Sequence, residues 1–210
     1  IGQGLLSDMG GIYTLGVAPG TVLRGNRIHD VRAFGYGGWG IYPDEGSTGL
    51  LIENNCVFNT KAAGFHQHYG RDNVIRNNVF AFGQEAQIQR TRQEPHRSFV
   101  FERNIVVTDK GPLMTGNWAG DGFTFDHNTY WSYGGGPLNL GGRSIEQWRA
   151  EGQDRNSVLA DPKFDDRTKF DFRIQAGSPA LVQGFKAFPA LSPTRERKDV
   201  PSFPPAFPGT

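Results

Sequence analysis

The sequence lacks the features that mark several classes of protein. Its single cysteine, Cys56, cannot form a disulfide within the chain, which excludes a fold held together by internal disulfides and says little about the compartment. No stretch resembles a signal peptide or a membrane span. We therefore expect no membrane partner.

An excess of charge of either sign is also missing. The chain has 22 Lys and Arg against 21 Asp and Glu, which gives a formal net charge of +1. Proteins that bind nucleic acid usually carry an unbalanced basic stripe, so the sequence predicts no nucleic-acid partner. The length of 210 residues and the hydrophobic content of 37% instead indicate a single domain able to bury a core.

The sequence does contain a repeat. Five segments align without gaps, and each carries an asparagine with apolar residues three positions before it and two positions after it. The shared asparagines are Asn26, Asn55, Asn78, Asn104 and Asn128, which gives steps of 29, 23, 26 and 24 residues. The preceding apolar residues are Leu23, Ile52, Ile75, Phe101 and Phe125, and each is followed by a charged residue. This alternation is typical of a strand with one side buried.

Repeats of this size predict an all-β solenoid. A unit of ~25 residues cannot bury its own apolar side and must stack on its neighbours. A parallel β-helix of about six coils places one such strand per coil at the ordinary strand spacing of ~4.8 Å. The asparagines would then stack, each amide bonding to the next at a tight corner that needs left-handed backbone geometry.

The chain divides into three parts. We predict coils over residues 1–142, a short helix and a C-terminal closing segment over residues 143–187, and a proline-rich extended tail over residues 188–210. Four apolar residues of the closing segment are expected to cover the open end of the last coil: Phe164, Phe170, Phe172 and Ile174. The first residues fall inside a coil, and solenoids need a cap at each end. We therefore expect this chain to be the C-terminal part of a longer protein.

A second strand in each coil gives a candidate binding surface. Its inward residues are predicted to be Ile41, Phe65, Ile88, Met114 and Leu138. The same alignment places Tyr42 beside His66 and Gln89, and it places Asp44 beside His68 and Thr91. The predicted wall of this groove contains Tyr13, Trp39, Tyr42, His66 and Gln89, with Asp44, Glu45, His68, Tyr69, Arg90 and Arg92 just beyond.

These residue types favour a carbohydrate. Aromatic rings pack on the C–H faces of sugars, while carboxylates, imidazoles and guanidinium groups bond to hydroxyls. A polysaccharide or oligosaccharide is therefore the expected partner. A solvated face that carries unrelated polar residues is the alternative. Arg90, Arg92 and His96, which lies in an arginine-rich loop, would suit an anionic sugar such as a uronate, or the two arginines would pair with nearby glutamates.

Two histidines allow a metal alternative. His66 and His68 lie two apart on a predicted strand, so both point to the same side and could ligate zinc with a third group. The acids available as third ligand have a use in catalysis instead. The predicted site therefore contains no metal and no cofactor.

The acids of the groove suggest glycoside hydrolysis. That reaction needs two carboxyl groups, ~5–5.5 Å apart for a retaining enzyme and ~6.5–9.5 Å apart for an inverting one. The candidates are Asp8, Asp44 and Glu45, which come from adjacent coils. A like charge on Glu45 would help to keep a proton on Asp44 near neutral pH. We therefore predict Asp44 as acid/base, Asp8 as nucleophile, and Glu45 as the substitute for the acid.

Four motifs carry a family resemblance: SDMGGIYTLG, GGWGIYPDEGSTG, GFHQHYGRDNVIRNN and QRTRQEPH. Over residues 4–142 the chain resembles the right-handed β-helix enzymes of glycoside hydrolase family 141, which includes fucosidase and xylanase activities. The resemblance implies a right-handed helix and a retaining mechanism with two aspartates, which map onto Asp8 and Asp44. We accordingly expect a monomeric bacterial enzyme of the periplasm or the extracellular space.

Two other classes share this architecture. A polysaccharide lyase removes a proton beside a uronate carboxylate, typically with calcium and a basic residue. Tyr69, His68 and Arg92 could serve such a reaction, but no calcium cluster of three or more acids is visible in the sequence. The second class is a non-catalytic β-helix that binds glycan without cleaving it.

Overall fold

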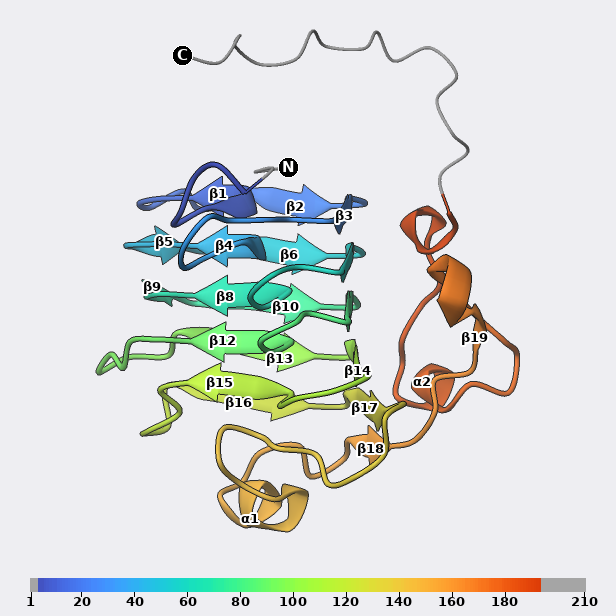
Figure 1. Ribbon diagram of the computed structural model, residues 1–210. Coiled ribbons are helices and arrows are strands. Elements are labelled where there is room, and N and C mark those ends of the chain that lie inside the picture. The colour runs from blue at the N-terminus through green and yellow to red at the C-terminus, as the bar shows by residue number, and fades with distance from the viewer. Residues whose placement is uncertain (1–3, 194–210) are drawn as a thin grey trace, which may run out of the picture.

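The computed structural model describes residues 4–193, and over this range the chain winds into a stack of coils (Figure 1). The first sheet, in spatial order, contains β1 (Gly10–Thr14), β4 (Trp39–Pro43), β8 (Phe65–Gln67), β12 (Ile88–Arg90) and β15 (Met114–Gly116). The second contains β2 (Val22–Arg24), β6 (Leu51–Glu53), β10 (Asn73–Arg76), β13 (Phe99–Glu102) and β16 (Phe123–Asp126).

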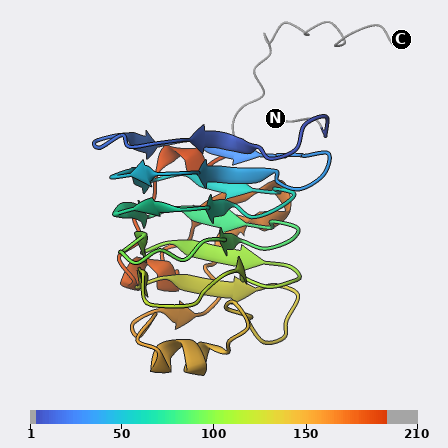
Figure 2. The same cartoon turned by 90° about the vertical axis from the view of Figure 1, so that its left-hand side faces the viewer.

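The third sheet contains β3 (Arg27–His29), β7 (Cys56–Phe58), β11 (Val79–Ala81), β14 (Ile105–Thr108), β17 (Thr129–Ser132) and β18 (Val158–Leu159). Every neighbouring pair in the three sheets is parallel, and each of the first five coils contributes its strands in the same order. Figure 2 shows these coils stacked one on another in chain order. The predicted parallel β-helix is confirmed. Two short strands, β5 (Ser47–Thr48) and β9 (Gly70–Arg71), pair beside the first sheet.

The asparagine ladder, which we define as Asn26, Asn55, Asn78, Asn104 and Asn128, stacks as predicted. In each step the side-chain oxygen of one asparagine accepts from the backbone and side-chain nitrogens of the asparagine before it. At Asn78 these two donors, from Asn55, lie at 2.9 and 3.0 Å. The left-handed backbone falls on the residue before each ladder position, for example Asn54 (φ 56°) and Asn77 (φ 54°), and not on the ladder itself.

The ladder ends on a buried carboxylate. Asn128 donates its side-chain amide to Asp154 at 3.0 Å, and Tyr130 and Trp148 donate to the other oxygen of Asp154 at 2.9 and 2.8 Å. Burial raises the pKa of Asp154, against the opposing effect of these donors. Ser157 takes the next ladder position, since its hydroxyl accepts from the backbone of Asn128 at 2.8 Å.

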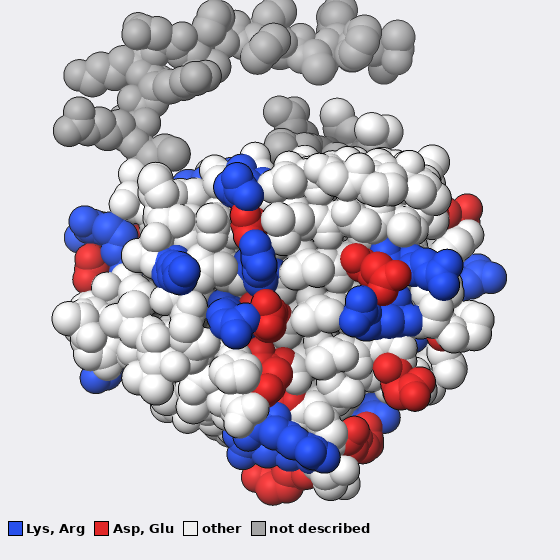
Figure 3. Space-filling view, turned by 180° about the vertical axis from the view of Figure 1, so that it is seen from behind, with Lys and Arg blue, Asp and Glu red and all other residues white. Residues whose placement is uncertain are grey.

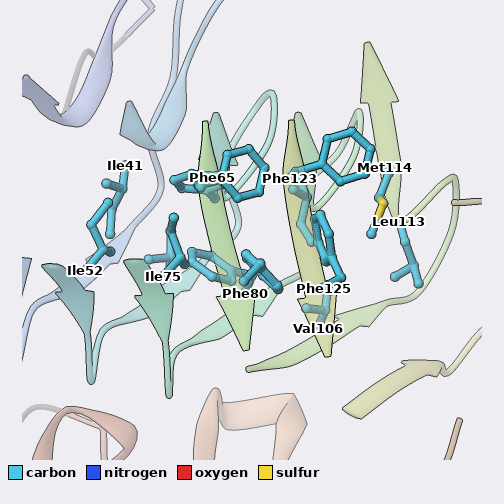
Figure 4. Packing of buried hydrophobic residues seen from close by; sticks show 14 of the residues in the cluster. Ile41, Ile52, Phe65, Ile75, Phe80, Val106, Leu113, Met114, Phe123 and Phe125 are labelled. Carbon is cyan, nitrogen blue, oxygen red and sulfur yellow. The ribbon is translucent and has the colours of Figure 1, made fainter. Parts of the chain in front are cut away.

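The interior is filled by the predicted inward residues. Ile52, Ile75, Phe101 and Phe125 are essentially inaccessible to solvent, and they pack against the inward residues of the first and third sheets (Figure 4). In the first sheet, Ile41, Phe65, Ile88 and Met114 form one column by strand register. The next member is Leu140 and not the predicted Leu138. A glycine turn at residues 134–136, left-handed at its last two positions, lengthens this coil.

A helix closes the C-terminal end of the stack. Helix α1 (Ile145–Ala150) begins at Ser144 with a capping box and buries Trp148, whose ring stacks on Phe123 at a centroid distance of 5.5 Å. In Figures 1 and 2 this helix lies beyond the last coil, at the end opposite β1. Sheet pairing continues past the helix, because β18 joins β17.

The closing segment covers the side of the solenoid and not its open end, so our expectation for its phenylalanines was wrong. It contains β19 (Phe164–Asp166), η1 (Arg167–Lys169), β20 (Asp171–Ile174), α2 (Pro179–Val182) and η2 (Pro189–Leu191). Phe170 and Phe172 pack on Phe58 of β7 at 4.7 and 5.2 Å between ring centroids. The outward side chains of β7, β11 and β14 in the third sheet are apolar, so these strands need cover on both faces.

The start of the predicted tail also differs from expectation. Residues 189–191 form a turn of 3-10 helix that buries Leu191, and Arg27 donates to the carbonyl oxygen of Ala190 at 2.9 Å. The remainder of the predicted tail, residues 194–210, lies outside the described residues. Within residues 4–193, no helix is both long and apolar enough to cross a membrane.

The stack predicts that two substitutions to aspartate, one inward and one outward, lower the free energy of unfolding by very different amounts. Ile75→Asp places a charge in the dry interior without a partner, and we expect the free energy of unfolding to fall by about 4 kcal/mol or more. Thr124→Asp, at an exposed position of β16, is the matched control and should change it by less than about 0.5 kcal/mol. Urea denaturation followed by circular dichroism measures both. Equal losses would contradict the assigned register.

Candidate active site

One cleft gathers most of the predicted site residues. It has a volume of about 450 Å³ and lies along the outward face of the first sheet. We call it the aspartate cleft, and its lining is Asp8, Tyr36, Gly37, Trp39, Tyr42, Asp44, Glu45, His66, His68, Glu85, Gln89 and Thr91. Trp39, Tyr42, His66 and His68 border this one cavity, as predicted from the sequence.

Coil stacking brings the two aspartates together. Asp8 lies in the turn before β1, with left-handed backbone (φ 53°), and its amide donates to the carbonyl oxygen of Tyr36 at 3.0 Å. Asp44 follows β4, and its amide donates to the carbonyl oxygen of Thr14 at 2.9 Å. Since β1 and β4 are paired neighbours, residues 36 positions apart in sequence line the same cleft.

The wall of the cleft is aromatic. Tyr42 stacks on His66 at a centroid distance of 4.6 Å, and Trp39 lies 4.5 Å from Tyr42 and 4.3 Å from His66. Tyr13 makes a T-shaped contact with Tyr42 at 5.2 Å, as strand register predicts, but it lies beside the cleft and is not one of its lining residues. The indole nitrogen of Trp39 donates to the side-chain oxygen of Gln89 at 2.5 Å. This contact fixes the plane of the tryptophan ring beside the acids.

Each aspartate is contacted by a phenol. Tyr13 donates its hydroxyl to Asp44 at 2.6 Å, and Tyr42 donates to Asp8 at 3.4 Å. The hydrogen bond to Asp44 raises the pKa of Tyr13 to about 12. Burial, with the charges of Asp44 and Asp8, raises the pKa of Tyr42 further. Both phenols therefore keep their protons at neutral pH and act as donors toward the carboxylates.

Two imidazoles share one hydroxyl. His66 approaches Thr91 Oγ1 with its Nε2 at 2.9 Å, and His68 approaches the same oxygen with its Nδ1 at 2.8 Å. A hydroxyl has one proton, so at least one imidazole N–H donates to it. Burial, with a smaller effect of His68, lowers the pKa of His66 to about 3, so His66 is neutral near pH 7. Across residues 4–193, no three His, Cys, Asp or Glu side chains form a group that could hold a metal ion.

Several predicted residues lie outside the cleft. Arg90 points inward, donates to the carbonyl oxygens of Asn117 and Ala119 at 3.1 Å each, and lies 5.0 Å from the ring centroid of Phe123. Strand alternation explains this placement, because Gln89 beside it points outward. Burial lowers the pKa of Arg90. Our expectation that Arg90 lies just beyond the groove wall, available to a sugar, was wrong.

The remaining basic residues lie beyond the edge of the cleft. Arg92 packs over the ring of Tyr69 at 4.7 Å, and that ring lies 4.9 Å from His68. His96 contacts Glu94 and the carbonyl oxygen of Gly70 at 3.2 Å each, and it is not part of the lining. The predicted binding role of His96 at this cleft has no contact to support it.

Two lining residues were missed by the sequence reasoning. Tyr36 lies in the loop between Asn26 and Asn55. The 29-residue step between these two asparagines, the longest of the repeat, was the only sign in the sequence that this loop protrudes. A hydrogen bond with Asp8 raises the pKa of Tyr36. Glu85 lies in the turn after β11, which the repeat does not place. With Glu85, four carboxylates line the cleft, and the described lining contains no Lys or Arg.

Comparison with known proteins agrees with this architecture. The family model for a right-handed β-helix region matches residues 4–144, which is more than half of the chain. Searches of the curated proteins and of the solved structures found no match. The extent of the family match, together with the parallel stack of coils, shows that the chain belongs to the right-handed β-helix family.

Proposed function

We propose that the aspartate cleft is the active site of a glycoside hydrolase. The observation that carries the proposal is that Asp8 and Asp44, from adjacent coils, line one cleft and are each contacted by a tyrosine hydroxyl. Two carboxyl groups beside a bound sugar are what glycoside hydrolysis requires. The right-handed β-helix family is consistent with enzymes that act on carbohydrates.

The composition of the cleft favours a neutral sugar. The rings of Trp39, Tyr42 and Tyr36 in the lining offer faces and edges on which sugar C–H groups can pack. Four carboxylates without an opposing Lys or Arg in the described lining would repel a uronate. The resemblance to glycoside hydrolase family 141 adds fucosides and xylan-like linkages of complex polysaccharides as the proposed substrates.

The contacts also suggest a division of roles. The hydroxyl of Tyr13 donates to Asp44 at 2.6 Å, and this short hydrogen bond orients the Asp44 carboxylate. Asp8 receives the longer contact from Tyr42, at 3.4 Å, and a hydrogen bond from Tyr36. We therefore assign Asp44 as the nucleophile and Asp8 as the acid/base, which reverses the order suggested by the sequence. Glu45, next to Asp44 in the lining, is the substitute for the acid.

In this mechanism, Asp44 attacks the anomeric carbon while Asp8 protonates the leaving oxygen. Water then attacks the glycosyl ester with Asp8 acting as base, so the anomeric configuration is retained. Neutral His66 supplies no charge to either step. The imidazole of His68, held by Thr91, is placed to bond a sugar hydroxyl.

A polysaccharide lyase is the second candidate. The contacts of Arg92 with Tyr69, and of Tyr69 with His68, join a guanidinium, a phenol and an imidazole at the edge of the cleft. Such a group could neutralise a uronate and remove its neighbouring proton. Digestion of a uronate polymer would then raise ultraviolet absorbance through an unsaturated product. A hydrolase produces reducing ends without this absorbance, and a non-catalytic glycan-binding protein produces neither.

Substitution of the aspartates tests the mechanism. Asp8→Asn and Asp44→Asn should each lower kcat for a glycoside substrate by roughly a thousandfold, because each removes one of two required groups. Azide should restore turnover of Asp44→Ala and give a glycosyl azide of inverted configuration. Asp72→Asn, an exposed aspartate paired with Arg97, is the control and should retain activity. An inverted glycosyl azide from Asp8→Ala instead would reverse the roles, and near-normal activity of either variant would remove that residue from the mechanism.

Substitution of His68 separates binding from folding. His68→Ala should lower kcat/KM by about tenfold through a lost hydroxyl contact, with a change of less than about 2 °C in Tm. His29→Ala, a partly exposed histidine on the third sheet, should leave kcat/KM unchanged. Steady-state kinetics and thermal melting provide the two readouts. A large fall in Tm that parallels the loss of activity would indicate that His68 has only a structural role.

A further inference from the structure

A second cavity lies on another face of the molecule. It has a volume of about 500 Å³ and lies between the outward side of the second sheet, the corners that follow its strands, and the chain at residues 184–187. We call it the basic pocket, and its lining is Glu53, Asn54, Arg76, Asn77, Arg103, Gly184, Lys186 and Ala187. Figure 3 shows this face, with basic and acidic residues alternating in a column along the stack.

The charges of the basic pocket do not cancel. Its lining holds three cations, Arg76, Arg103 and Lys186, against one acid, Glu53. The two oxygens of Glu53 are already occupied, because Arg24 donates to one at 2.7 Å and Arg76 to the other at 2.8 Å. Among the ion pairs of residues 4–193, Lys186 has none. Donors therefore remain in the pocket while its only carboxylate is satisfied.

Arg103 and Arg76 keep part of their donor capacity. Arg103 pairs with Glu102 through one terminal nitrogen at 2.6 Å, and Arg76 uses its Nε toward Glu53. A guanidinium has five N–H donors in a planar fork, so each arginine retains N–H groups for an oxyanion. Both side chains are close to half-exposed, at 40% and 45%, and so are accessible to a ligand.

The pocket is held in a fixed shape. The side chain of Asn77 donates to the carbonyl oxygen of Lys186 at 2.8 Å and accepts from its amide at 2.6 Å. Gly184 has left-handed backbone (φ 84°), and a Cβ there would lie 3.2 Å from Nε of Arg103. Glycine therefore allows the chain to pass close to Arg103. Because the backbone of Lys186 is held by Asn77 before binding, less entropy is lost when a ligand binds.

We propose that the basic pocket binds an oxyanion carried on a glycan, either a sulfate ester or a uronate carboxylate. Arginine forks bond such groups in a bidentate manner, and the ammonium group of Lys186 adds three further N–H donors. The volume accommodates a sugar unit together with its anionic group. The site is distinct from the aspartate cleft, whose lining is acidic, and the inference does not depend on hydrolysis there.

Isothermal titration calorimetry of the intact protein tests this site. Four ligands are compared: a sulfated oligosaccharide, an oligogalacturonate of the same length, a neutral oligosaccharide of the same length and inorganic sulfate. We expect binding of at least one anionic oligosaccharide, with affinity that falls as salt rises. Lys186→Glu and Arg103→Glu should each weaken it by about tenfold or more, and Lys186→Arg should preserve it. The ratio of sulfated to uronate affinity identifies the preferred group.

Lys110→Glu is the matched control. Lys110 is also exposed but lines another cavity, and its substitution changes the net charge by the same amount as Lys186→Glu. It should change the affinity less than about twofold. Asp44→Asn should retain anion binding even if hydrolysis is lost, so failure of the proposed hydrolase function leaves this test intact. Equal losses in Lys110→Glu and Lys186→Glu, or no binding of either anionic oligosaccharide at millimolar concentration, would overturn the proposal.

Discussion

The hydrogen bonds of the asparagine ladder are the constraint on which the other features depend. Each ladder amide bonds to the next coil and to backbone carbonyl oxygens, as Asn78 does with Asn104 and Ile52. These bonds fix the start of one strand in every coil relative to its neighbours. A slip of one residue would exchange inward and outward side chains, so the ladder also determines which groups reach the aspartate cleft.

Features that recur with the repeat could be predicted from the sequence. The ladder, the inward column of Ile52 and Ile75, and the row from Tyr42 to His66 follow from alignment of equivalent strands. Features outside the repeat could not. Arg90 is a different case, because it lies within the repeat and strand alternation places it inward beside the outward Gln89. Phe170 was misplaced because an apolar segment alone does not reveal whether an end or a side of the solenoid needs cover.

The cleft illustrates the same limit. The repeat aligned Asp44 with His68, but it contained no information about the turn that carries Asp8 or the loop that carries Tyr36. Their positions depend on tertiary hydrogen bonds, such as the one between the amide of Asp8 and the carbonyl oxygen of Tyr36. The structure also reveals a charge asymmetry that the net charge of +1 conceals. Acids concentrate in the aspartate cleft, whereas the basic pocket carries an excess of cations.

The proposed mechanism requires Asp44 to form a covalent bond with the substrate. Incubation of the protein with a fluorinated glycoside that forms a slowly hydrolysed glycosyl ester, followed by proteolysis and tandem mass spectrometry, tests this directly. The account predicts one glycosyl group per chain, attached to the Asp44 side chain. Attachment to Asp8 would reverse the roles, and attachment to a residue outside the aspartate cleft would contradict the account.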